Sequence, residues 1–139
     1  MKNFKKLEKN CVDINNLTAL NVGVSDMTRE GYFEMNSGRN SFVSESGKQS
    51  VRLSCVDEIL NGVDVTYMKF DVEGEEEKAL LGAKETILRC KPKMLVSAYH
   101  RSEDIFKLPL LVNGIRNDYK IYMRHYPYIP AWDTNFYFV

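Results

Sequence analysis

The sequence has too few cysteines, at the wrong spacing, for a disulfide framework or a zinc site. Only three occur in 139 residues, Cys11, Cys55 and Cys90, and they are far apart. Disulfide-stapled secreted domains use even numbers of cysteines, and structural zinc sites use closely spaced pairs. A reducing cytosol is therefore the simplest setting for this chain, and no metal-ligand set is expected.

Long hydrophobic runs and an excess of charge of one sign are also missing. No apolar stretch approaches the roughly 20 residues of a membrane-spanning helix, and the first ten residues lack the apolar region of a signal peptide. Lysine plus arginine and aspartate plus glutamate total 19 each, so the net charge is zero at pH 7. We therefore expect a cytoplasmic protein that binds neither nucleic acid nor membrane.

The residues that are present predict a single domain, 1–139, of α/β class. Helices are expected at residues 2–11, 75–91 and 102–115, with a helical turn that ends near Asn61-Gly62. Strands are expected at residues 17–26, 30–36, 40–46, within 50–60, and at 65–72, 93–100, 119–126 and 134–139. The order favours a mostly parallel sheet, in which 65–72 is a buried strand, with an antiparallel addition at the C-terminus.

Two carboxylates stand where the strand 65–72 gives way to a helix. In open α/β sheets, ligands bind beyond the carboxyl ends of the strands, and Asp71 and Glu73 occupy that edge. Gly74 lets the backbone turn into the helix. Spacing alone leaves open whether the pair binds a metal, a ligand amine or a substrate hydroxyl. The following acidic run, residues 75–77, is interpreted as stabilising the helix dipole.

Two histidines and a group of aromatic residues complete the candidate side chains. His100 ends the strand 93–100 at the same predicted edge, whereas His125 lies inside a strand, where a structural role is more usual. The aromatic residues near the C-terminus are interpreted as core and lid packing, with a carbohydrate platform as the alternative: Tyr126, Tyr128, Trp132, Phe136, Tyr137 and Phe138.

Residues 56–100 resemble the FkbM-type methyltransferases, a branch of the S-adenosylmethionine-dependent class. That family carries a stretch of the form IKIDVEG-E---L-GA, followed by a lysine-proline pair and a strand. A weaker likeness upstream and downstream extends this resemblance over nearly the whole chain. The resemblance implies a Rossmann-like class I methyltransferase sheet. The matching positions are Lys69, Asp71, Val72, Glu73, Gly74, Leu81, Gly82, Ala83, Lys91, Pro92, Tyr99 and His100.

The chain departs from this family at the cofactor loop. The family's first two strands and its D-x-G-x-x-x-G turn are absent, and neither Gly23 nor Gly31 stands in such a loop. We therefore expect a truncated domain with an incomplete sheet. Residues 17–26 and 65–72, which the missing strands would separate, must either leave a gap or pair directly. Another chain that supplies the missing strands is one possible partner.

The resemblance implies roles for four residues. Asp26 would approach the adenine of S-adenosylmethionine, and Asp71 would lie near the methyl-bearing end of this cofactor. Glu73 would face the acceptor, and either Glu73 or His100 would remove the proton from its hydroxyl. The expected acceptor is a sugar, glycan or other small metabolite. The chain on its own is expected to be weakly active or inactive.

Two other functions stay open from the sequence. One is a non-catalytic α/β binding or assembly module that kept the acidic edge after losing the cofactor loop. The other is a metal-dependent hydrolase that uses Asp71, Glu73 and His100, although no paired-ligand spacing such as H-x-x-x-H supports it. Binding of the cofactor would distinguish a methyltransferase from a non-catalytic module. A requirement for a divalent metal would indicate the hydrolase.

Overall fold

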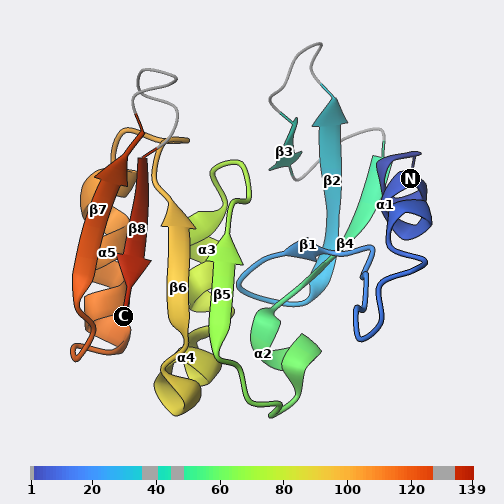
Figure 1. Cartoon of the computed structure of the whole chain (residues 1–139). Coiled ribbons are helices and arrows are strands. Elements are labelled where there is room, and N and C mark those ends of the chain that lie inside the picture. The colour runs from blue at the N-terminus through green and yellow to red at the C-terminus, as the bar shows by residue number, and fades with distance from the viewer. Residues whose placement is uncertain (1, 36–40, 45–48, 127–133) are drawn as a thin grey trace.

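The computed structural model describes residues 2–35, 41–44, 49–126 and 134–139, and contains two four-stranded sheets (Figure 1). We call them sheet A and sheet B. Sheet A has the order β1 (Gly23–Val24), β4 (Gln49–Ser54), β2 (Arg29–Met35), β3 (Ser41–Ser44). Sheet B has the order β5 (Tyr67–Phe70), β6 (Lys93–Ser97), β8 (Thr134–Phe138), β7 (Ile121–His125). The described helices are α1 (Lys2–Asn10), α2 (Val56–Leu60), α3 (Glu76–Leu81), α4 (Lys84–Cys90) and α5 (Asp104–Ile115).

The pairing of the strands confirms the α/β class but corrects the expectation of a mostly parallel sheet. Among the described strands, only β1 with β4 and β5 with β6 pair in parallel. The other four pairings are antiparallel. The reason is local: β2 lies between β3 and β4 and runs antiparallel to both, and β8 returns beside β7 to enter between β6 and β7. An antiparallel C-terminal addition was expected from the sequence.

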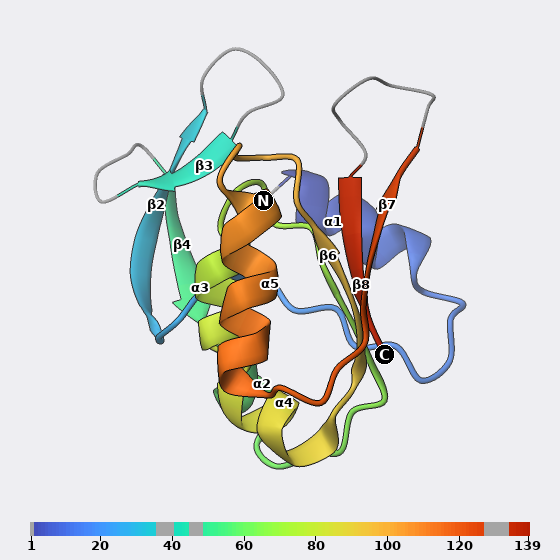
Figure 2. The same ribbon diagram turned by 90° about the vertical axis from the view of Figure 1, so that its left-hand side faces the viewer.

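Helices α3, α4 and α5 cover one face of sheet B (Figure 2) and enclose the main core. The apolar stripe of the helical segment 75–91 consists of Ala79, Ala83, Ile87 and Cys90; the first three are fully buried there, whereas Cys90 is half-buried. These three buried residues pack in one cluster with Phe70 and Val96 of the sheet. Burial of each large apolar side chain contributes about 1.5–3 kcal/mol. In the described part of the chain, no helix combines the length and hydrophobicity needed to cross a bilayer.

The opposite face of sheet B is open over β5 and β7. Side chains along β5 alternate between exposed and buried, and all five residues of β7 are exposed. The expectation of a fully buried strand at 65–72 was therefore wrong, because no described helix covers Tyr67 and Lys69. Helix α1 lies to the right of sheet B in Figure 1, so it does not cover this face.

None of the strands that the structure describes lies between the neighbouring edges of sheet A and sheet B. The predicted strand 17–26 shrinks to β1, which pairs only with β4, while β5 pairs only with β6 among the described strands. Of the two arrangements expected for these segments, the structure therefore shows separation rather than direct pairing. A strand extends only where its backbone groups find hydrogen-bonding partners. Among the described strands, the one neighbour of β1 is β4, which has six residues.

The predicted helix 75–91 is broken into α3 and α4 by contacts from α2. The backbone N–H of Asp57 donates to the carbonyl of Gly82 at 2.9 Å. The Asp57 carboxylate accepts from the backbone N–H groups of Glu85 and Thr86 at 3.0 and 2.9 Å, which caps the first turn of α4. A Cβ on Gly82 would collide with the carbonyl oxygen of Ser25. These contacts hold the end of sheet A against the helices of sheet B.

Candidate functional site

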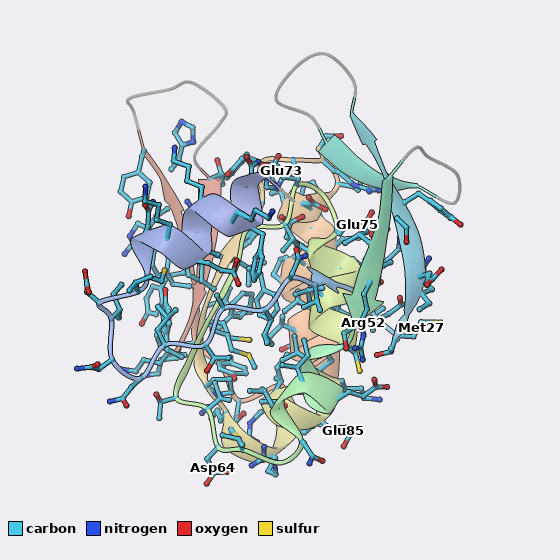
Figure 3. The ribbon with its side chains drawn as sticks, turned by 90° about the vertical axis from the view of Figure 1, so that its right-hand side faces the viewer. Met27, Arg52, Asp64, Glu73, Glu75 and Glu85 are labelled. Carbon is cyan, nitrogen blue, oxygen red and sulfur yellow. The ribbon has the colours of Figure 1, made fainter. Side chains whose placement is uncertain are left out.

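The turn between β5 and α3 is built from two consecutive residues with left-handed backbone. Glu73 has φ 56° and Gly74 has φ 94°. Glycine adopts this conformation freely, whereas a glutamate there carries strain of about 1–2 kcal/mol. The turn leaves the Glu73 side chain 59% exposed. Glu73 lies beyond the carboxyl end of β5, in the upper part of Figure 3.

His100 lies over the same edge because β6 pairs in parallel with β5. Parallel neighbours end at one side of a sheet, so the residues after β6 meet those after β5. The Nε2 atom of His100 is 3.5 Å from Glu73 Oε2 and 3.8 Å from Asp71 Oδ1. The predicted site residues Asp71, Glu73 and His100 are thus brought together, and the imidazole is 10% exposed.

Asp71 is held by two hydrogen bonds from neighbouring side chains. Lys69 Nζ donates to Oδ2 at 3.0 Å, and the Tyr99 hydroxyl donates to Oδ1 at 2.8 Å. Partial burial raises the pKa of Asp71, but these two hydrogen bonds outweigh it and hold that pKa below its ordinary value. Burial, together with the Asp71 carboxylate, raises the pKa of Tyr99 to about 12. At neutral pH, Asp71 is therefore an anion and Tyr99 remains a hydrogen-bond donor.

Glu76 is a site residue that the sequence interpretation missed. Its side chain is only 1% exposed, and its Oε1 accepts from the backbone N–H of Val72 at 2.9 Å. Oε1 also lies 2.8 Å from His100 Nδ1, but this approach is not aligned as a hydrogen bond, and both ring nitrogens and Glu76 Oε2 lack a hydrogen-bond partner among the described residues. Glu76 lies in the first turn of α3, as the interpretation of the run 75–77 expects, but its contact with His100 was not predicted.

Glu75 and Asp104, the other buried acidic groups around the turn, have partners of different kinds. Glu75 is buried and pairs with Lys78 Nζ at 2.7 Å and with Arg101 at 3.4 Å. Asp104 accepts from the backbone N–H of Arg101 at 3.2 Å. Burial, followed by the nearby Glu76 carboxylate, raises the pKa of Asp104. Among the described residues, neither Asp104 nor Glu76 forms an ion pair with a lysine or arginine, and Glu76 Oε2 also lacks a hydrogen-bond partner.

Asp26 does not join this cluster. It follows β1 at the end of sheet A, where its Oδ1 accepts from the Ser25 hydroxyl at 2.9 Å. Its chain neighbour Met27 lies well away from Glu73 in Figure 3. No interaction connects Asp26 with the described residues of the cluster, so its predicted role at an adenine depends on what would lie between the two sheets.

A second concave surface lies on the open face of sheet B. Tyr122, Arg124, Tyr126 and Tyr137 line a groove of about 550 Å³. Nδ1 of His125 forms a hydrogen bond of 2.9 Å with the Thr134 hydroxyl, which supports a structural role for His125. Of the aromatic residues expected in the core, Phe136 and Phe138 are buried but Tyr126 is exposed; Tyr128 and Trp132 lie outside the described residues.

Known proteins similar to this chain agree on one family. The methyltransferase FkbM domain family matches residues 2–129. Among solved structures, the chain is similar to the crystal structure of methyltransferase FkbM from Methylobacillus flagellatus KT, with 29% sequence identity and a TM-score of 0.75. The match covers 99% of this chain but 33% of that chain. No curated protein matches the sequence significantly.

Proposed function

Because this chain belongs to the methyltransferase FkbM domain family, we propose that it forms the acceptor side of an S-adenosylmethionine-dependent methyltransferase. The observation that carries the proposal is the convergence of Asp71, Glu73 and His100 beyond the carboxyl ends of β5 and β6. The proposed acceptor is a hydroxyl of a sugar or of another small metabolite.

The acidic edge fits the cationic end of S-adenosylmethionine. Asp71 and Glu73 are at least partly exposed, and their carboxylates complement the ammonium and sulfonium charges of that molecule. The glycine-rich turn that the family uses to hold the methionine part of this cofactor is not in this sequence. The Asp71 cluster would therefore contact only the methyl-bearing part, and a segment between the sheets would complete the binding site.

The side chains of this edge have distinct tasks in a methyl transfer. S-adenosylmethionine, when bound, supplies an electrophilic methyl group. Lys69 and Tyr99 fix the orientation of Asp71, whose carboxylate would lie near the methyl-bearing end of the cofactor and align it with the acceptor. Glu73 or His100 Nε2 then takes the hydroxyl proton as the oxygen bonds to the methyl carbon, while the electrons of the broken carbon–sulfur bond stay on sulfur.

The chain alone is proposed to be weakly active or inactive. It spans 33% of the length of the similar solved protein, and none of the described strands lies between the edges of β1 and β5. We propose that another polypeptide segment, in this protein or in a partner chain, pairs with these edges. A cytoplasmic location is part of the proposal and is consistent with the three free cysteines.

A binding or assembly module without catalysis is the second candidate. The observation that favours it is the open face of sheet B, where exposed tyrosines surround a groove. Such a module would keep the fold and the open edges but would not bind the cofactor.

Calorimetric titration of the purified chain with S-adenosylmethionine and S-adenosylhomocysteine tests the first candidate against the second. We expect saturable binding that Asp71→Asn weakens about tenfold or more. Asp64→Asn is the matched control, because Asp64 is 91% exposed at the opposite end of β5 (Figure 3). Absence of binding up to millimolar ligand, or equal affinity in both variants, would contradict a cofactor contact at this edge.

A further inference from the structure

We propose that Asp71, Glu76 and His100 form a binding site for one divalent metal ion. Each of these side chains offers one donor atom, and the three donor atoms all lie within 4.8 Å of one another. They come from three separate segments, the end of β5, the first turn of α3 and the residues after β6, and are brought together by the parallel pairing of β5 with β6.

The second observation is the set of unpartnered polar atoms at the centre of this cluster. Glu76 Oε2 belongs to a side chain that is 99% buried, yet it has no hydrogen-bond partner among the described residues, and neither has either ring nitrogen of His100. Buried polar groups are nearly always paired, and an unpaired buried carboxylate is costly. A metal ion between Glu76 and His100 would satisfy an oxygen and a nitrogen together.

The local charge also favours a cation. Asp71, Glu73 and Glu76 contribute three carboxylates around His100, and Lys69 is the ammonium group that reaches them. With a neutral imidazole, the formal charge is −2, which a divalent ion would balance. The neighbouring Glu75, by contrast, already has two cationic partners and is not expected to take part.

The donor types narrow the choice of ion. Two carboxylates and one imidazole, with no thiolate, suit an ion that prefers oxygen ligands and also accepts a nitrogen ligand, such as Mn²⁺. With bonds of about 2.1 Å, the donors of an octahedral ion stand roughly 3.0–4.2 Å apart. The distance of 3.8 Å between His100 Nε2 and Asp71 Oδ1 already lies in this range, so Asp71 can take part while Lys69 and Tyr99 hold its orientation. The exposed side of the site would leave coordination positions for water or for an acceptor oxygen.

The ion would deepen the proposed function, and this part of the inference rests on it. A metal-bound acceptor hydroxyl loses its proton more readily. Since His100 would then be a ligand, Glu73, 3.5 Å from its ring, would be the group that takes the proton. Binding of the ion itself does not depend on methyl transfer.

The test is a Mn²⁺ titration of the full chain, previously freed of metal, with free Mn²⁺ measured by electron paramagnetic resonance. We expect saturable binding of one ion per chain, weakened about ten- to a hundredfold in Glu76→Gln and in His100→Asn. Coupling of bound Mn²⁺ to a nitrogen nucleus should be present in the original chain and lost in His100→Asn. Glu77→Gln, in the same helix but paired with Lys107, is the matched control and should bind normally.

Several outcomes would overturn the site. They are an absence of saturable Mn²⁺ binding up to millimolar concentration, equal affinity in Glu76→Gln and Glu77→Gln, or a bound ion without a nitrogen ligand. If circular dichroism shows that a buried-site variant does not fold, the exposed Asp71→Asn variant takes its place. A parallel titration with S-adenosylmethionine in the presence of a chelator tests the proposed function separately. Binding of Mn²⁺ without binding of the cofactor would support the metal site but not the proposed function. Binding of the cofactor without binding of Mn²⁺ would refute the metal site and leave the proposed function standing.

Discussion

The hydroxyl of Tyr99 donates a hydrogen bond to Asp71 Oδ1 at 2.8 Å and so joins the residues that follow β6 to the end of β5. Asp71 receives a second bond from Lys69 on its other oxygen. Its carboxylate is therefore fixed in direction before any ligand arrives. Because Asp71 is 34% exposed, this order is maintained at a surface that solvent and ligands can reach.

A double-mutant cycle measures the strength of this bond. Tyr99→Phe and Asp71→Asn should each lower the free energy of unfolding, and the cycle should give a coupling energy of about 0.5–1.5 kcal/mol. Urea denaturation of the four proteins provides the values. Tyr67→Phe, on the exposed face of β5, is the control, and its coupling with Asp71→Asn should be close to zero. A coupling energy near zero for Tyr99 as well would show that the bond does not hold in solution.

Substitution of two glycines should have opposite effects on stability. In Gly82→Ala the new methyl group would collide with the backbone carbonyl of Ser25 and crowd Cys55, and we expect a loss of at least about 2 kcal/mol. In Gly114→Ala the methyl group meets nothing within 4 Å inside α5, and better helix propensity should stabilise the chain by about 0.5–1 kcal/mol. Thermal and urea unfolding check both values. Equal stability of the two variants would mean that sheet A does not rest on the junction of α3 and α4.

Elements with a clear local pattern were predictable from the sequence. Helix α1 was expected from its amphipathic stripe, and the end of α4 from Pro92, which follows a left-handed Lys91. The break at Gly82 was not predictable, because it depends on Asp57, which reaches it from a distant part of the chain. The length of β1 likewise depends on which partner strands are present, and a local pattern carries no information on that.

The candidate site was predictable in part for a similar reason. The rule that ligands bind beyond the carboxyl ends of parallel strands brought Asp71, Glu73 and His100 to one edge before their distances were known. Glu76 was overlooked because it was treated as one of three equivalent helix-terminal charges. A signal did exist: Glu76 lies three and four residues before Ala79 and Leu80, on the stripe of α3 that is buried.

Replacement of Glu73 by glycine should relieve backbone strain. With φ 56°, Glu73 occupies a region that glycine enters without penalty. We expect Glu73→Gly to leave the free energy of unfolding unchanged or to raise it by up to about 1 kcal/mol, even though a charged side chain of the site is lost. Glu77→Gly in α3 is the matched control and should lose about 1 kcal/mol. Destabilisation of both variants by similar amounts would argue against strain at the turn.

Asp118 should make the stability of the chain depend on acidity. Arg116 Nε donates to its Oδ1 at 2.7 Å, and Lys91 Nζ lies 3.0 Å from its Oδ2. Hydrogen bonds from Arg116 and then from Lys91 lower the pKa of Asp118 from 3.8 to about 2. Between these two values the unfolded chain binds more protons than the folded chain, so acidification removes the stabilisation that Asp118 provides.

Comparison with Asp118→Asn isolates this effect. The original chain should exceed the variant in free energy of unfolding by a constant margin above about pH 5, and the margin should shrink as the pH falls from about 4 toward 2. Urea denaturation at several pH values measures the margin. Since Lys91, Arg116 and Asp118 lie at the surface, 1 M salt should reduce the margin in free energy of unfolding at neutral pH. A margin that persists at pH 2 would show that Asp118 acts through packing rather than through its charge.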